Sequence, residues 1–192
     1  MAGAVSQAAF CLAYAHAALR LRWPLALTAG SLAFALSTLA LRWLPLSLGP
    51  LAVVAIGSLL VSRALMPPSA APARVAAALP WWDIPARIVV TTAFVLLLTG
   101  IASQLGPRLT GLVTPFPLYA AVLVVFTHAL EGPARAAGVL RGLLLGLYCF
   151  VGFFFVLALL LERAGVATAF AAAAAVALAV QGAALWVLRH HA

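Results

Sequence analysis

The sequence has very little charge and contains no lysine. Charged residues make up 7% of its 192 residues and hydrophobic residues 67%, whereas an ordinary soluble domain is about 25% charged and about 45 to 50% apolar. So few charged side chains cannot cover a surface that faces water, which excludes a soluble globular domain and indicates a membrane protein. The lack of lysine also excludes a Schiff-base lysine and a P-loop nucleotide site.

Residues for other kinds of catalysis and for metal binding are also scarce. The chain has three acidic residues, four histidines and two cysteines. Cys11 and Cys149 lie deep in separate apolar runs, where packing is the default role and a disulfide framework is not indicated. The sequence has no serine, histidine and aspartate set, and only the terminal His190 and His191 stand close together. We therefore expect no enzymatic activity, no metal and no cofactor.

Seven apolar runs approach or exceed the length of about 20 residues that a membrane-crossing helix needs. They predict an all-α fold, a polytopic transmembrane helix bundle of about seven spans. A count of six is the alternative, if one run is lost. The runs cover residues 3–19, 24–44, 46–65, 84–105, 109–130, 136–161 and 165–188.

A proline-rich connection separates the third run from the fourth. It combines prolines, which break helices, with Trp81 and Trp82, which suit the headgroup region of a bilayer. We therefore predict an N-terminal three-helix membrane segment (1–68), an interfacial linker (69–83) and a four-helix membrane segment (84–192).

All eleven basic residues are arginine, and their distribution predicts the orientation. Basic residues in short loops stay on the cytoplasmic side. With the N-terminus outside, eight arginines fall on the cytoplasmic side and three on the outer side, so we predict N-terminus out and C-terminus in. Because the arginines are scattered singly, no nucleic-acid partner is expected. The eight are Arg20, Arg22, Arg63, Arg74, Arg87, Arg135, Arg141 and Arg189, and the three are Arg42, Arg108 and Arg163.

The stretch at 110–119 predicts a broken helix. Pro115 and Pro117 each remove a backbone donor and push the preceding residue out of helical geometry, so regular helix is expected only after Pro117. In transporters, interrupted spans mark binding sites, because freed backbone groups can face a cavity. Thr110, Thr114, Pro115 and Pro117 are therefore candidate substrate-binding residues. The alternative is that proline is simply tolerated in a first helical turn.

Four charged or titratable residues near the predicted inner side form a second candidate group. His128 and Glu131 close the fifth run, and Arg141 lies one to two turns into the sixth, with Glu131 as its expected partner. Arg87 can pair with Asp83 one turn away. One interpretation is a positively charged vestibule for an anionic headgroup, lined by these four residues and His16. The other is that the positive-inside rule alone produces the cluster, without a ligand.

Gly138, Gly142 and Gly146 lie on one face of the sixth run at four-residue spacing. Such a face lets another helix approach closely, which predicts a helix-packing role. We expect the partner to be another span of this chain, with a second protomer as the alternative.

From about Pro85 onward the sequence resembles the GlpM-like family of small bacterial inner-membrane proteins. The resemblance rests on Thr110-Gly111-Leu112-Val113, on Pro115-Phe116-Pro117, on the apolar run 118–126 ending at Thr127-His128, and on Arg141. It implies a multi-pass protein of the bacterial inner (cytoplasmic) membrane, linked to production of exopolysaccharide, notably alginate, with no established catalytic residues. The first three runs have no counterpart in that four-helix family.

Together these features predict a small transporter or flippase-like protein for an anionic or lipid-linked compound in envelope polysaccharide metabolism. The alternative is a non-transporting accessory or scaffold subunit that docks into a membrane complex through its glycine face. The expected partners are membrane lipids, an anionic or lipid-linked substrate, and either a second copy or a membrane complex. A water-filled cavity lined by Gln104, Thr110, Thr114 and Arg141 would favour transport.

Overall fold

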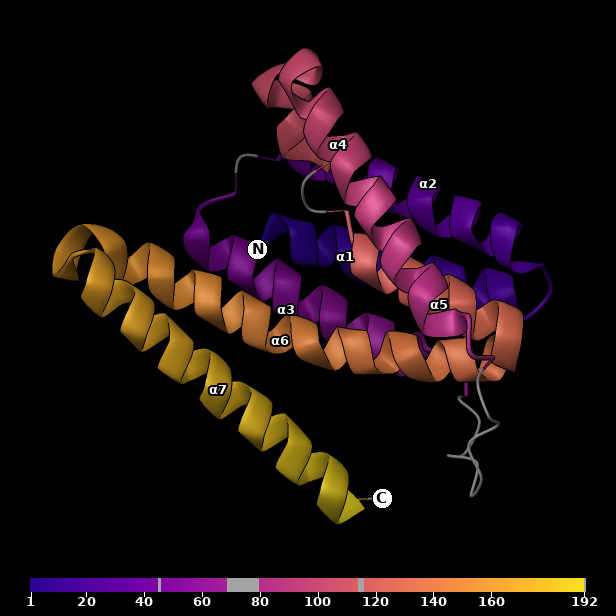
Figure 1. The fold of residues 1–192 in the computed structure, drawn as a ribbon. Helices are drawn as coiled ribbons and strands as arrows, with labels where there is room; N and C mark the ends of the chain where they lie inside the picture. The colour runs from indigo at the N-terminus through magenta and orange to yellow at the C-terminus, as the bar shows by residue number, and fades with distance from the viewer. Residues whose placement is uncertain (45, 69–79, 114–115, 192) are drawn as a thin grey trace.

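The computed structural model describes residues 1–44, 46–68, 80–113 and 116–191, with side chains described throughout except at 98, 101–113 and 187–191. These residues form seven α-helices (Figure 1). The helices are α1 (Ala2–Ala18), α2 (Trp23–Arg42), α3 (Leu48–Leu65), α4 (Asp83–Val113), α5 (Leu118–Glu131), α6 (Pro133–Ala164) and α7 (Val166–His191).

The predicted break before the fifth helix is confirmed. Pro117 is the N-cap of α5, with φ −79° and ψ 64°, and the helix begins at Leu118. The predicted start of the fifth run at residue 109 is wrong, because α4 continues to Val113. Apolar residues on both sides of a proline pair look alike in a hydropathy pattern, but the prolines cannot supply the backbone donors that would join them into one helix.

Four of the described helices are long and apolar enough to cross a membrane: α2, α3, α6 and the part of α7 up to Trp186. With 14 residues, α5 is shorter, since about 1.5 Å per residue gives it about 21 Å against a hydrocarbon core of about 30 Å. The fold is thus an all-helical bundle of the kind embedded in membranes. A count of seven spans, and their orientation, remain predictions.

Helix α1 lies at the centre of the bundle and is the most buried element. It packs against α2, α3 and α6, and its Phe10, Cys11 and Tyr14 are fully buried. Alanines at positions 4, 8, 15 and 18 are also buried, and such small side chains let neighbouring helices approach closely. The core cluster around α1 includes residues of α2, α3, α5 and α6, so helices from both halves of the chain share it.

Gly30 marks a close approach of α2 to α1. A Cβ atom added there would lie 3.0 Å from two carbons of the Phe10 ring and 3.2 Å from the Cβ atom of Tyr14. Both neighbours are fully buried, so neither can move aside without disturbing the core.

We expect Gly30→Ala to lower the free energy of unfolding by about 1–3 kcal/mol, the usual cost of overpacking a core. The matched control is Gly57→Ala on α3, where an added Cβ meets nothing within 4 Å, and which should be neutral or stabilise by up to about 1 kcal/mol. Unfolding of the detergent-solubilised protein measures both. Equal stability of the two variants would contradict the close approach.

One end of the bundle collects most of the arginines. The connection between α1 and α2, the ends of α3 and α5, and the starts of α4 and α6 all lie there (Figure 1). Arg74, and the side chain of Arg189, lie outside the described residues. We call this the arginine-rich end; it carries Arg20, Arg22, Arg63, Arg87, Arg135 and Arg141.

Helix α7 packs along α6 and leaves most of its surface uncovered (Figure 1). Gly152 of α6 faces Val176 and Val180 of α7, and the rings of Phe153 and Phe170 meet edge to face with centroids 6.0 Å apart. Leu178 and Trp186 are 74% and 61% exposed. A soluble protein rarely exposes an apolar surface of this extent, which agrees with lipid contact along α7.

Candidate functional site

Arg141 stabilises the end of α3. Its guanidinium Nη2 donates hydrogen bonds to the carbonyl oxygens of Met66 and Pro67, both at 2.9 Å, and its Nε donates to Pro67 at 3.3 Å. Met66 is the C-cap residue of α3 and Pro67 follows it, and the guanidinium gives both carbonyl oxygens a charged donor. The expected pairing of Arg141 with Glu131 is wrong: the ion pair of Glu131 is with Arg135, at 3.9 Å.

His128 contacts α1. Its Nδ1 lies 3.2 Å from the hydroxyl of Tyr14, within hydrogen-bond distance, and the two rings meet edge to face. Tyr14 is fully buried, so this contact gives the one polar atom of its side chain a partner. The pair joins α1 to α5 at the arginine-rich end.

Arg87 pairs with Asp83, as its spacing predicts. Its Nε lies 2.9 and 3.0 Å from the two carboxylate oxygens of Asp83. The guanidinium also lies over the ring of Phe126 on α5, with Cζ 5.3 Å from the ring centroid. The pair neutralises Arg87 and the ring contact fixes the first turns of α4 against α5.

The predicted vestibule therefore divides into separate contacts. Arg141 binds the end of α3, His128 contacts α1, Glu131 faces Arg135, and Arg87 binds Asp83. Pro117 is buried at the start of α5. Thr114 and Pro115, and the side chains of Gln104 and Thr110, lie outside the described residues.

At two of its three positions, the glycine face of α6 meets no other helix in the part of the chain that the structure describes. A Cβ added at Gly142 or Gly146 would find no described atom within 4 Å. The side chains that α6 buries are instead larger, Leu140, Leu144, Leu147 and Val151 among them. The described residues therefore include no packing partner for Gly142 or Gly146.

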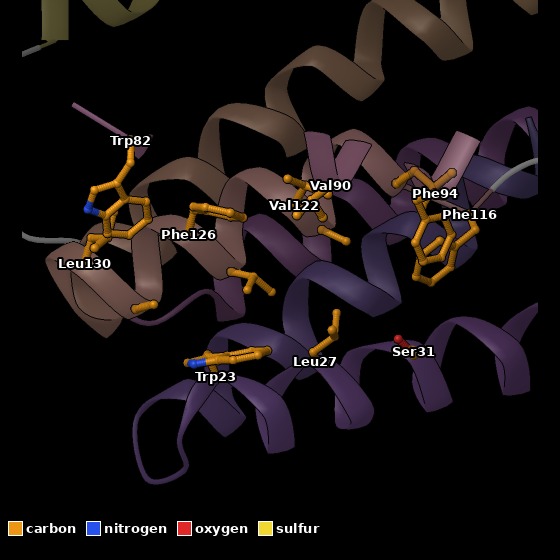
Figure 2. Close-up of a pocket in the computed structure, with 14 residues that line it drawn as sticks. Trp23, Leu27, Ser31, Trp82, Val90, Phe94, Phe116, Val122, Phe126 and Leu130 are labelled. Atoms are coloured by element: carbon orange, nitrogen blue, oxygen red, sulfur yellow. The ribbon is translucent and has the colours of Figure 1, made fainter. Parts of the chain in front are cut away.

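An apolar cavity of about 600 Å³ lies near these residues, between α2, α4 and α5. Figure 2 shows Trp23, Trp82 and Leu130 towards one end and Phe94 and Phe116 at the other. Apart from the hydroxyl of Ser31 and the indole N–H groups, its lining side chains are hydrocarbon: Trp23, Leu27, Ser31, Trp82, Val90, Phe94, Phe116, Leu118, Ala121, Val122, Val125, Phe126, Ala129 and Leu130.

Aromatic contacts build the walls of this cavity. Phe116 closes one end by packing edge to face on Phe34 of α2 and Phe10 of α1, with centroids 5.3 and 5.9 Å apart. Phe126 is held under Arg87 on the α4 side. Helix α5 is short and carries the small residues Ala121 and Ala129 on the cavity side. The space beside them is bordered by α4 but not filled by it.

Sequence reasoning missed this cavity. The sequence indicates only an interfacial anchor at Trp82, and nothing in the α2 sequence distinguishes Trp23, Leu27 and Ser31 from the residues on the other face of that helix. The usable signal is the pairing of a tryptophan at the start of α2 with one at the start of α4, both at the predicted inner side.

No family model, curated protein or solved structure matches this chain. The GlpM-like resemblance of the region from about Pro85 therefore remains a prediction based on the residues that carry it.

Proposed function

We propose that this protein binds a lipid or lipid-linked compound by its acyl chain in the cavity between α2, α4 and α5, and moves that compound as a small flippase-like transporter. The observation that carries the proposal is the cavity itself, with its volume of about 600 Å³ and its apolar lining. Ligand pockets in proteins are typically about 300–1,000 Å³. An acyl chain matches this lining, because it has no groups that need hydrogen bonds from the cavity walls.

The shape of the cavity must account for binding of an acyl chain, because lipid tails in the surrounding bilayer are as apolar as the cavity walls. Moving a chain from the bilayer into the cavity gains no hydrophobic free energy, only closer van der Waals contact with rings such as Phe94, Phe116 and Phe126. Selection between lipids therefore has to come from the part of the molecule outside the cavity.

Movement of α4 offers a route for the compound. Helix α4 forms one wall of the cavity and packs chiefly against α5, which begins at the break after Pro117. A shift of α4 across α5 would widen the cavity without unpacking α1 from the core. Arg141 and His128, the residues predicted to contact an anion, are already engaged by α3 and α1.

Blocking the cavity is expected to stop transport. Val122 lies midway along the cavity (Figure 2), so Val122→Trp should reduce movement of a fluorescent phospholipid across reconstituted liposomes to the rate of protein-free liposomes. The control is Val53→Trp on α3, at a side chain that is 71% exposed and outside the cavity. Thermal unfolding of both variants checks that they fold.

Two outcomes would overturn the proposal: wild-type liposomes no faster than protein-free ones, or equal rates for Val122→Trp and Val53→Trp. The first would favour the second candidate, a non-transporting subunit of a membrane complex. That candidate is favoured by one observation, the uncovered positions Gly142 and Gly146 on α6, where a helix of another protein could approach closely.

A further inference from the structure

The cavity has a distinct mouth at the arginine-rich end. The indoles of Trp23 and Trp82 lie there, at the starts of α2 and α4, with Leu130 near the end of α5 (Figure 2). Tryptophan is enriched where hydrocarbon meets headgroups. An acyl chain lying along the cavity would therefore leave it at this mouth, and the lipid headgroup would lie beside the connection between α1 and α2.

Two arginines stand at this mouth without a carboxylate partner. Arg22 directly precedes Trp23, and Arg20 lies in the same connection; both are exposed. The chain has three acidic residues. Asp83 binds Arg87 and Glu131 faces Arg135, while Glu162 lies in the last turn of α6, at the opposite end of that helix. No acidic residue is left to neutralise Arg20 and Arg22, so the mouth is positively charged.

The start of α2 adds to this charge. Arg22 is its N-cap residue, and no side chain hydrogen bond caps the helix within the described structure. The N–H groups of a first helical turn carry partial positive charge and favour an anion. Thus Arg20, Arg22 and the start of α2 present positive charge beside Trp23.

We propose that the cavity binds an anionic phospholipid, with an acyl chain between α2, α4 and α5 and the phosphate beside Arg20 and Arg22. This inference rests on the proposed function and names its substrate class. The residues that select the headgroup are then Arg20 and Arg22, whereas Arg87 contributes little because Asp83 neutralises it. A zwitterionic lipid fits the cavity equally well but carries a cation that these arginines repel.

Native mass spectrometry of the purified protein tests the assignment, with phosphatidylglycerol and phosphatidylcholine of identical acyl chains as probes. The wild type should bind phosphatidylglycerol more strongly than phosphatidylcholine. The Arg20→Gln/Arg22→Gln variant should lose that preference while binding phosphatidylcholine as before. Each arginine near an anionic lipid contributes about fivefold, and both together about thirtyfold. The control is Arg42→Gln/Arg163→Gln, which removes the same charge from the ends of α2 and α6 away from the mouth.

The outcomes separate the two proposals. Binding of neither lipid by the wild type, or binding that Val122→Trp leaves unchanged, would overturn the acyl-chain cavity and this inference with it. Equal binding of both lipids by the wild type would overturn only the selection of an anionic headgroup. The same conclusion would follow if Arg42→Gln/Arg163→Gln lowered the preference for phosphatidylglycerol as much as Arg20→Gln/Arg22→Gln does.

Discussion

Arg87→Ala is expected to lower the free energy of unfolding by about 3 kcal/mol, because it leaves a buried carboxylate without its counterion. The side chain of Asp83 is only 2% exposed, and Nε of Arg87 lies 2.9 Å from it. The substitution also removes the guanidinium from the ring of Phe126. Both losses loosen α4, the outer wall of the cavity.

Removing Asp83 instead of Arg87 should lower the free energy of unfolding by less. Asp83→Ala leaves Arg87, whose side chain is 19% exposed, and a long arginine can turn its charged end towards water. We therefore expect a loss of about 2 kcal/mol for Asp83→Ala, the usual contribution of a hydrogen bond between charged groups. The loss should be smaller for the double variant Asp83→Ala/Arg87→Met, which leaves no unpaired charge and keeps an apolar stem over Phe126. Denaturation of the wild type, Asp83→Ala, Arg87→Met and the double variant in detergent forms a double-mutant cycle, and Arg87→Ala is measured beside it. An Arg87→Ala variant as stable as the wild type would contradict the pair.

Arg141→Ala is expected to be the second strongly destabilising change, at about 2–4 kcal/mol. The substitution removes charge-assisted hydrogen bonds at the end of α3. They run from Nη2 of Arg141 to the carbonyl oxygens of Met66 and Pro67, both at 2.9 Å. Arg141→Lys should lie between the wild type and alanine, since an ammonium cannot reproduce the planar fork that reaches both oxygens.

A surface arginine one to two turns earlier on the same helix provides the control. Arg135 faces Glu131 at 3.9 Å, and both side chains are about 30% exposed (31% and 28%). Such an exposed pair contributes about 0–1 kcal/mol, so Arg135→Ala should change stability little. Thermal unfolding without added lipid measures both variants. Equal stability of Arg141→Ala and Arg135→Ala would show that Arg141 does not hold the end of α3.

Features that depend on neighbours along the chain could be predicted. The apolar runs predict the helices, and Pro117 predicts the start of α5 at Leu118, because a proline limits its own backbone whatever surrounds it. The four-residue spacing of Asp83 and Arg87 likewise predicts their ion pair. The grouping of arginines at alternate helix ends follows from the order of the runs.

Contacts between distant helices required the tertiary structure. Arg141 and Glu131 stand close in sequence, yet Arg141 binds carbonyls 74 and 75 residues away. His128 contacts Tyr14, 114 residues away, and the cavity combines three helices that no local pattern links. The candidate site moved accordingly, from Arg141 and His128 to the cavity lined by Trp23, Trp82 and Val122.

The sequence by itself thus determined that this protein is a set of apolar helices with its arginines largely at one end. Only the tertiary structure decided which helices are neighbours, which arginines are already paired and where a hollow remains. The physical reason is that in a bilayer the lipid tails are as apolar as leucine, so hydrophobicity makes a helix membrane-embedded without choosing its partner. That choice depends on close packing, as at Gly30 against Phe10, and packing is a property of surfaces that the chain brings together only when it folds.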